Sequence, residues 1–294
     1  MKFSALVSSS FLLLSAVVSA QTAGNASTRV DKCTKPGLVA LTFDDGPGQY
    51  NDQLLALLKK KNVPATFFVL GSMIDQVPSQ AASLKKMLDA GHQLASHTYS
   101  HQNLDAMTDD QMKLEMKNTS DTMFKNAAVR PHYMRAPEGA CAAKCQSVMA
   151  GLGLIVTHWN VDTNDWRNKD MAPAQATNAS MTEINNLIVA KSDPKVDSFI
   201  ILEHEIHKFS VDFLAEQVID AVQKKGYKFV TVEECVGQAA YLAGSTVPSK
   251  SAGPSATGTG SGSKPSGAPT SGAMTLMASA WTLAVSVLLT YTLL

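Results

Sequence analysis

Short apolar runs alternate with longer amphipathic stretches between Cys33 and Leu242, and this alternation limits the possible folds more than any other feature. The apolar runs have the length of strands, whereas the longer stretches repeat their apolar residues at helical spacing. Repeated strand-then-helix units give parallel strands covered by helices. Because about seven such units fit into this region, we predict an α/β fold with about seven parallel strands, arranged as a (β/α) barrel rather than an open sheet.

The predicted elements follow from the spacing of apolar residues along the chain. The predicted strands are Leu38–Phe43, Ala65–Leu70, Gln93–Ser96, Tyr133–Ala136, Leu154–Val161, Ser198–Leu202 and Lys228–Val232. The predicted helices are residues 51–62, 79–91, 109–126, 181–192 and 212–226.

The two ends of the chain differ in composition from this central region. Residues 1–20 combine Lys2, an apolar stretch and a Val-Ser-Ala ending, which is typical of a secretory signal peptide. Residues 244–272 are rich in Ser, Gly, Thr and Pro and predict a flexible linker. The uncharged apolar residues 273–294 lack a basic residue after them and follow a group of small residues. They predict a removable glycosylphosphatidylinositol signal with Ser266 as the attachment residue, although a transmembrane anchor also fits their length.

These segments predict a route through the secretory pathway to the cell surface. There the lipid would anchor the protein to the plasma membrane, with the cell wall as a further destination. Three sequons, at Asn25, Asn118 and Asn178, are compatible with secretion. The net charge of zero argues against a nucleic-acid partner.

The four cysteines suit an oxidising compartment. Cys33 and Cys235 lie near the two ends of the central region, whereas Cys141 and Cys145 are close neighbours. We therefore predict disulfides between Cys33 and Cys235 and between Cys141 and Cys145. A zinc site at CAAKC is the alternative, but no second cysteine pair lies nearby in the sequence.

Unusual polar residues follow the predicted strands. In a barrel the carboxyl ends of the strands carry the chemistry, so these residues are predicted to meet in one site. In chain order they are Asp44 and Asp45, His97 and His101 in SHTYSH, Arg135 in RAPEG, Asp162 and Asp165 in WNVDTNDW, and His204 in LEH.

The spacing of His97 and His101 allows both imidazoles to reach one metal ion. Two histidines four residues apart are by themselves more often a surface accident, but a carboxylate at a strand end completes a set of three ligands. If Asp45 is that ligand, Asp44 stays free to accept a proton from an activated water. The alternative is that the Asp-Asp-Gly-Pro sequence is only a solvated turn.

The remaining polar residues complete a hydrolytic site. His204 can protonate a leaving group if Asp165 raises its pKa, and Arg135 can pair with Asp44 and orient it. Asp162 is interpreted either as a site residue or as a partner for nearby backbone. Trp166 is interpreted as a core residue.

The series TFDDGP, SHTYSH, RAPEG, DTNDW and LEH resembles the five motifs of the polysaccharide deacetylases of carbohydrate esterase family four, and of fungal chitin deacetylases in particular. The resemblance covers roughly residues 36–236 and makes residues 21–243 the catalytic domain. It implies a distorted (β/α) barrel, and we expect the enzyme to be a monomer. It also implies metal-dependent hydrolysis of the N-acetyl groups of chitin or chito-oligosaccharides, giving chitosan and acetate at the fungal cell surface or wall.

The resemblance also implies a role for each site residue. It makes Asp44 the base, His204 the acid, and Arg135 and Asp165 the residues that tune them. It makes Asp45, His97 and His101 the ligands of one divalent ion, zinc or cobalt.

The same resemblance extends to the substrate. It makes Trp159 and Leu202 walls of the acetyl pocket, and it places the backbone N–H of Glu138 beside the oxyanion. In the third motif of the family, the residue before the glycine is usually Tyr, whereas here it is Glu138. A carboxylate at this position would repel a developing oxyanion.

Two alternative functions fit parts of the sequence. One is an esterase that removes O-acetyl groups from a polysaccharide such as xylan. The other is a catalytically silent protein that binds wall polysaccharide, although such a protein has no use for a complete set of ligands, base and acid.

Overall fold

The computed structural model describes residues 29–246. The chain divides into two units, Met1–Pro254 and Ser255–Leu294, and all described residues belong to the first. The signal peptide, Asn25, Ser266, residues 273–294 and nearly all of the predicted linker lie outside the described residues. Within residues 29–246, none of the helices combines the length and apolar character needed to cross a bilayer.

Parallel strands form one sheet at the centre of the unit, as the sequence predicted. In the described part of the chain the sheet has eight strands in the order β5-β4-β3-β2-β1-β7-β6, with β8 paired to β1. All of the strand pairings are parallel. The strands are β1 (Leu38–Gly46), β2 (Thr66–Val69), β3 (Gln93–Ser96), β4 (Tyr133–Met134), β5 (Ile155–Val156), β6 (Val161–Asp162), β7 (Phe199–His204) and β8 (Lys228–Val230).

One predicted strand is wrong, because Leu154–Val161 forms two strands at opposite ends of the sheet order. β5 pairs with β4, whereas β6 pairs with β7. The residues between them therefore connect the two edges of the curled sheet. Apolar character alone could not reveal this division, because both short strands are partly or fully buried.

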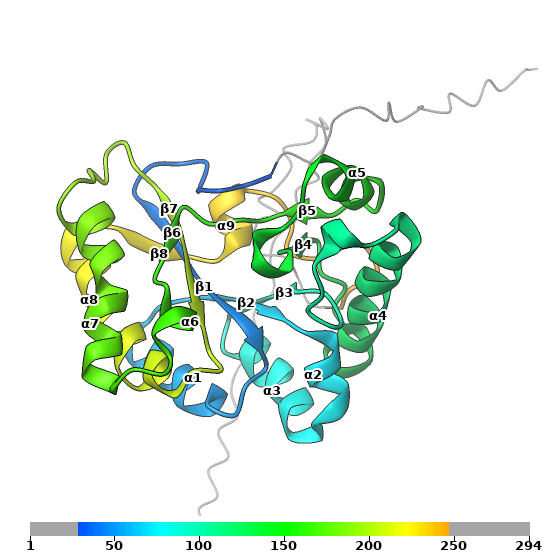
Figure 1. The fold of residues 1–294 in the computed structure, drawn as a ribbon, viewed down its shortest axis with the longest axis horizontal. Helices are drawn as coiled ribbons and strands as arrows, with labels where there is room; N and C mark the ends of the chain where they lie inside the picture. Colours follow the sequence, from blue (N-terminus) through cyan, green and yellow to red (C-terminus); the bar gives the residue numbers. More distant parts are fainter. Residues whose placement is uncertain (1–28, 247–294) are drawn as a thin grey trace, which may run out of the picture. The chain divides into compact units, whose positions relative to one another are not determined.

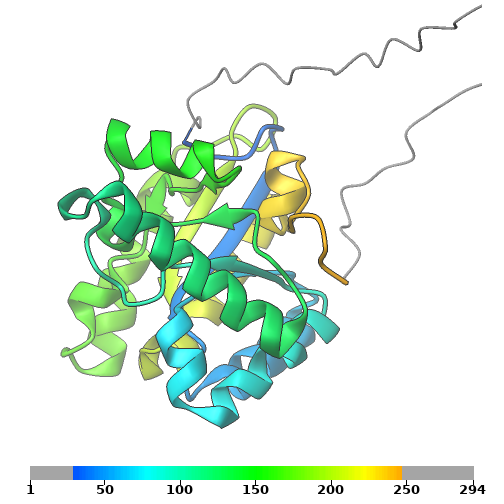
Figure 2. The same cartoon turned by 90° about the vertical axis from the view of Figure 1, so that its right-hand side faces the viewer.

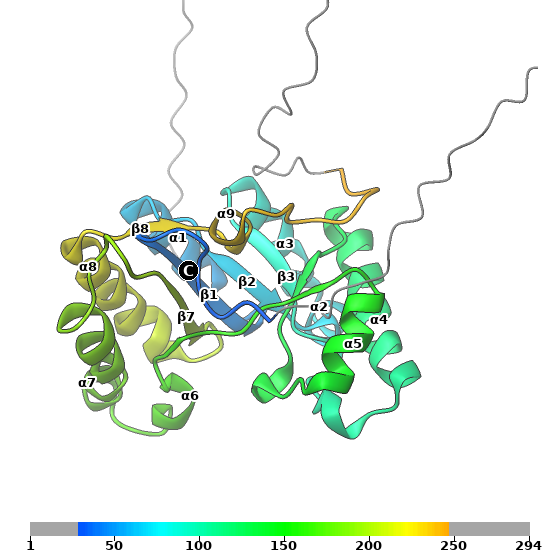
Figure 3. The ribbon, with the colours of Figure 1, turned by 90° about the horizontal axis from the view of Figure 1, so that it is seen from above.

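Helices surround the sheet. Figures 1 and 3 show α7 and α8 on one side and α4 and α5 on the other, while Figure 2 shows the long α4 crossing in front of the strands. The helices are α1 (Asn51–Lys61), α2 (Gly71–Gln76), α3 (Pro78–Asp89), α4 (Asp109–Ala127), α5 (Ala143–Gly151), α6 (Asp165–Asn168), α7 (Pro173–Glu183), α8 (Ala215–Lys225) and α9 (Val232–Val236). Shorter helical turns are η1 (Leu104–Ala106), η2 (Pro137–Gly139), η3 (Ile184–Val189) and η4 (Ser210–Leu214).

The outer faces of the strands and the inner faces of the helices form the main hydrophobic core. Leu41 and Phe43 of β1 and Ile201 of β7 are fully buried there against Leu54 of α1 and Val218 of α8. Side chains alternate along a strand, so every second residue faces the inside of the curled sheet instead.

The inward-facing residues form two layers, and we call upper the one that lies toward the carboxyl ends of the strands. The lower layer is apolar, and its fully buried side chains are Ala40, Phe68, Ala95, Tyr133 and Ile200. The upper layer comes from residues two or four positions later on the same strands or just past their ends: Asp44, His97, Arg135, Leu202 and His204. Because residues two positions apart on a strand share a face, the same face carries packing residues first and site residues further along.

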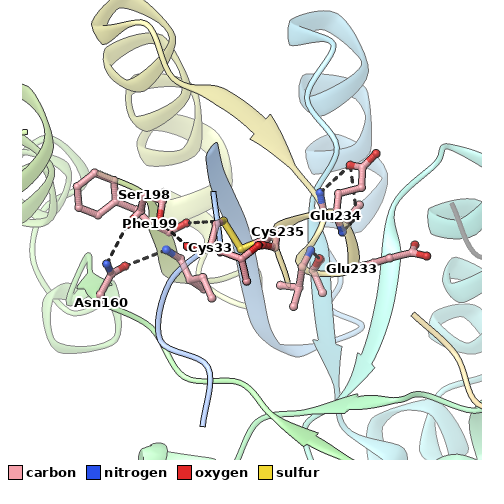
Figure 4. The surroundings of a disulfide bond; sticks show 12 residues. Cys33, Asn160, Ser198, Phe199, Glu233, Glu234 and Cys235 are labelled. Carbon is pink, nitrogen blue, oxygen red and sulfur yellow. Dashed lines mark hydrogen bonds between the residues drawn. A yellow bond between two sulfur atoms is a disulfide. The ribbon is translucent and has the colours of Figure 1, made fainter. Parts of the chain in front are cut away.

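Both predicted disulfides are confirmed. Cys33 is bonded to Cys235 beneath the lower layer, and Cys141 to Cys145 at the start of α5. Figure 4 shows the first bond, where the hydroxyl of Ser198 also donates to the carbonyl of Cys33 at 2.7 Å. This disulfide ties the start of the domain to its last helix, α9, and so closes the lower end of the barrel.

Two sequons lie on helices in the described residues. Asn118 of α4 is half-buried and Asn178 of α7 is exposed. Glycosylation at both positions stays a prediction.

Candidate active site

A β-bulge at the end of β1 brings two adjacent aspartates to the same site. Asp44 pairs with Phe68 of β2 and Gly46 with Val69, so Asp45 is an extra residue in the ladder. Its φ of 72° lies in the left-handed region, which Asp tolerates better than most residues. In a regular strand the two side chains would face opposite ways. Here both carboxylates reach the Nε2 atom of His97, at 3.7 Å for Asp44 and 3.3 Å for Asp45.

Asp45, His97 and His101 meet as a set of three metal-binding groups. Their ligand atoms lie within 4.8 Å of one another. The Nε2 atoms of His97 and His101 are 3.3 and 3.2 Å from Oδ1 of Asp45. That oxygen is buried and accepts no hydrogen bond, as expected for an atom that faces a cation.

The tautomer of His97 also fits a metal. Its Nδ1 lies 3.0 Å from the carbonyl oxygen of Arg135, which can only accept, so Nδ1 carries the proton. Nε2, which lies 3.3 Å from Oδ1 of Asp45, is then the ring atom available to a metal ion. One carboxylate and two imidazoles leave positions open on a divalent ion, which is typical of a catalytic site.

The loop that carries His101 is held by α4. The carboxylate of Glu115 accepts hydrogen bonds from the backbone N–H groups of Tyr99 and Ser100, at 2.9 and 2.8 Å, and from the Ser100 hydroxyl at 2.8 Å. The N–H of His101 donates to the Thr98 hydroxyl at 3.1 Å. Sequence analysis missed Glu115, because nothing in a helical acid indicates which loop it contacts.

The pKa values of Asp45 and His101 shift in opposite directions because the two groups interact. Burial alone would raise the pKa of Asp45, but the two imidazoles outweigh it and hold this pKa well below its ordinary value. Asp45 raises the pKa of His101, against a smaller opposing effect of burial. The Asp45 carboxylate is therefore fully ionised and available as a ligand at neutral pH.

Arg135 is fully buried under the site and fixes Asp44. One guanidinium nitrogen donates to Oδ1 of Asp44 at 2.7 Å and to the hydroxyl of Thr42 at 2.8 Å. Another donates to the carbonyl of His158 at 3.1 Å, in the segment that joins β5 to β6. The guanidinium also lies 4.0 Å above the ring of Phe68. Arg135 thus connects the charged upper layer with the apolar lower one.

His204 and Asp165 extend the site from β1 to the neighbouring β7. Nδ1 of His204 donates to Oδ1 of Asp165 at 2.7 Å, and the backbone N–H of His204 donates to Oδ2 at 2.7 Å. The hydroxyl of Ser210 also donates to Oδ2, at 2.8 Å. Burial would lower the pKa of His204, but Asp165 outweighs it and the pKa rises to about 9. The imidazole of His204 is therefore protonated at neutral pH, and its hydrogen bond to Asp165 through Nδ1 fixes the orientation of the ring and of Nε2.

Two further glutamates flank His204: Glu203 lies on β7, and Glu205 follows the end of that strand. The side chain of Glu203 alternates with that of His204 and is fully buried on the other face of the strand. Burial raises the pKa of Glu203 and of Glu205 well above the ordinary value. Glu205 fills the space beneath Gly46, where any Cβ would lie 1.6 Å from its carboxyl oxygen. Neither residue lines the cavity, but the Glu205 side chain takes the space that a side chain at position 46 would need.

A cavity of about 540 Å³ joins the two sides of the site. Its lining includes every predicted ligand, Asp44, His204, Trp159, Leu202 and Glu138. Asp162 lines it as well, while its carboxylate accepts from the backbone N–H of Asn164 at 2.7 Å, so both interpretations of this residue hold.

Trp166 and Arg167 also line the cavity, and sequence analysis missed both. The interpretation of Trp166 as a core residue is wrong, because 41% of it is exposed. The guanidinium of Arg167 lies 4.5 Å from its ring centre. An aromatic residue directly after a strand-end carboxylate was the available signal, since exposed tryptophans beside a polar cleft are common binding groups.

Comparisons with known proteins agree with this site. The sequence profile described as polysaccharide deacetylase matches residues 31–156. A chitin deacetylase of Colletotrichum lindemuthianum is 37% identical over 214 residues, covering 72% of this chain and 84% of the relative. A chitin deacetylase of Arthroderma benhamiae is 34% identical over 71% of this chain and 54% of the relative.

Solved structures agree as well. The Colletotrichum lindemuthianum chitin deacetylase superposes with a TM-score of 0.70 at 36% identity, covering 75% of this chain and 97% of the other. With its strand-end motifs gathered around one cavity, the protein belongs to the polysaccharide deacetylase family.

Proposed function

We propose that the protein hydrolyses the N-acetyl groups of β-1,4-linked N-acetylglucosamine in chitin, releasing acetate and leaving chitosan. One observation carries this proposal: three possible metal ligands, a carboxylate paired with an arginine and a histidine paired with a carboxylate surround one cavity. The names of the similar proteins from Colletotrichum and Arthroderma support the choice of chitin.

The ligand side of the site would activate water. Zinc or cobalt held by Asp45, His97 and His101 supplies Lewis acidity that acidifies water and polarises a carbonyl. Asp44 accepts the proton of the attacking water, because Arg135 holds one of its oxygens and leaves the other facing His97. The division of labour between neighbouring aspartates follows from the bulge at Asp45.

The acid side of the site would release the amine. An amide nitrogen leaves poorly unless it is protonated, and His204 supplies that proton from its Nε2. Asp165 stabilises the imidazolium before transfer and keeps the ring oriented. Asp44 and His204 are register partners on neighbouring strands, so base and acid stand side by side over the same cavity. The backbone N–H of Glu138 is the proposed additional donor to the oxyanion.

Acetate release from N-acetylglucosamine oligomers tests this proposal. We expect release by the purified protein to stop after chelation, to return with zinc or cobalt, and to fall about a hundred- to ten-thousandfold in Asp44→Asn. Equal metal content and circular dichroism of the variant would control for folding. Release from acetylated xylan but not from the oligomers would instead indicate an O-acetyl esterase. No release from either by a folded, metal-loaded protein would favour a binding protein.

We further propose that the protein acts as a monomer at the cell surface, held by a glycosylphosphatidylinositol lipid. The composition of residues 1–20 and 273–294 supports this, and both disulfides suit an oxidising compartment. Release of the protein from intact cells by a phosphatidylinositol-specific phospholipase, at the mass of a monomer, is the expected result. Retention on the cells after that treatment would contradict the lipid anchor.

A further inference from the structure

Glu138 places a negative charge on one wall of the cavity. It lies in η2 just after β4, with a φ of 58°, and its exposed side chain lines the cavity together with Asp45 and His101. The amide of Asn103 donates to its Oε2 at 3.3 Å. Among residues 29–246, no lysine or arginine forms an ion pair with it. A neutral amide therefore holds the carboxylate in place, and its negative charge is accessible to solvent and to a bound substrate.

The other acidic groups of the cavity are already occupied. Asp44 is paired with Arg135, Asp45 faces two imidazoles, and Asp162 accepts from the backbone of its own turn. Glu138 differs from them because, within residues 29–246, its side-chain hydrogen-bond partner is an exposed neutral amide, and its charge interaction with His101 involves no hydrogen bond. Of the four, it is the acid best placed to attract a cation on a bound chain.

Arg167 adds a positive charge to the lining of the same cavity. It follows β6, whereas Glu138 follows β4. Among the described residues the two side chains form no ion pair with each other, and the guanidinium of Arg167 lies over the ring of Trp166. A bound chain would therefore meet both an anionic and a cationic group in the cavity, and each can select for a different group of the substrate.

The proposed substrate carries only one kind of cation. Fully acetylated N-acetylglucosamine units are neutral, and a positive charge appears only when an N-acetyl group has been removed and the amine is protonated. Resting on the proposed function, we infer that Glu138 binds the ammonium group of a glucosamine unit next to the unit that reacts. The enzyme then acts preferentially on chains that are already partly deacetylated, and it disfavours chains that bring a carboxylate to the Glu138 wall.

Competing substrates test this inference. Three tetramers are compared at a slightly acidic pH: one is fully acetylated, and the other two carry a single glucosamine unit, at one end or at the other. We expect kcat/KM to be roughly two- to fivefold higher for one of the glucosamine tetramers, as for an ion pair in a partly solvated cleft. This preference should shrink as salt is added, because exposed charges are screened.

Two variants isolate the charge. Glu138→Gln keeps the size of the side chain and an acceptor for Asn103, and its ratio of the two kcat/KM values should fall to about one, whatever its absolute rate. Asp89→Asn removes the same charge from the exposed end of α3, outside the cavity lining, and should keep the wild-type ratio.

Two outcomes would overturn the inference while leaving the proposed function standing. One is acetate release at equal rates from neutral and cationic tetramers. The other is a cationic preference that persists unchanged in Glu138→Gln. Failure to release acetate from any tetramer would instead overturn the proposed function itself.

Discussion

The lower and upper layers of the barrel interior use the same strands for opposite purposes. Ile200 and His204 lie on one face of β7, and Ala95 and His97 on one face of the segment that begins as β3. The lower residues are apolar, fully buried and enclosed by the Cys33–Cys235 disulfide. Those above are charged or polar and are held by hydrogen bonds. One layer therefore supplies stability and rigidity, and the layer above it supplies the chemistry.

A mutation that leaves an empty space in the lower layer should affect stability but not activity. The loss of stability that it causes is the largest effect we expect. Ile200→Ala should lower the free energy of unfolding by about 2–5 kcal/mol, whereas Ile200→Val should lower it by only about 0.5–1.5 kcal/mol. Activity per folded molecule should stay close to that of the wild type. Denaturant unfolding and acetate release would check both expectations. A large loss of activity in a still folded Ile200→Ala protein would contradict the assignment of stability to the lower layer and chemistry to the upper one.

Loosening the upper layer should affect the metal more than the fold. Glu115→Ala removes three hydrogen bonds from the loop of His101, so we expect the Kd for zinc or cobalt to rise about 10- to 100-fold, with Glu115→Gln in between. Competition with a chelating dye would measure it. Asp110→Ala, on the exposed face of the same helix, should leave the Kd unchanged. An unchanged Kd in Glu115→Ala would show that the loop holds its shape without α4.

The smallest expected effect is a shift in pH dependence. Burial lowers the pKa of His204, but Asp165, with smaller contributions from Asp44 and Asp45, outweighs burial and raises this pKa from 6.5 to about 9. The protonated form is therefore present below this pKa and is lost as the pH rises through it. Asp165→Asn removes the charge that favours the protonated ring, and the alkaline limb of kcat/KM should move to lower pH, toward 6.5.

The matched control for this shift is Ser210→Ala, which removes a donor to Asp165 but leaves its charge. Its alkaline limb should stay near that of the wild type. A limb that stays in place in Asp165→Asn would mean that a group other than His204 sets it.

Much of the site could be predicted because its residues follow short apolar runs. Asp45, His97 and His101 come together as expected, since carboxyl ends of parallel strands meet at one edge. The cysteine pairing followed equally well from spacing, because Cys33 and Cys235 flank the domain. Trp166 was missed because an aromatic residue fits a core and a cleft equally well by composition.

The sequence by itself determined the alternation of strands and helices, the identity of the chemical groups, and most of the strand ends on which they lie. Only the tertiary structure decided how these groups face one another. The bulge that turns Asp45 beside Asp44, the crossing from β5 to β6, and the reach of Glu115 to the His101 loop all depend on contacts between distant segments. Local periodicity records which face a residue occupies, but it carries no information about which distant segment packs against that face.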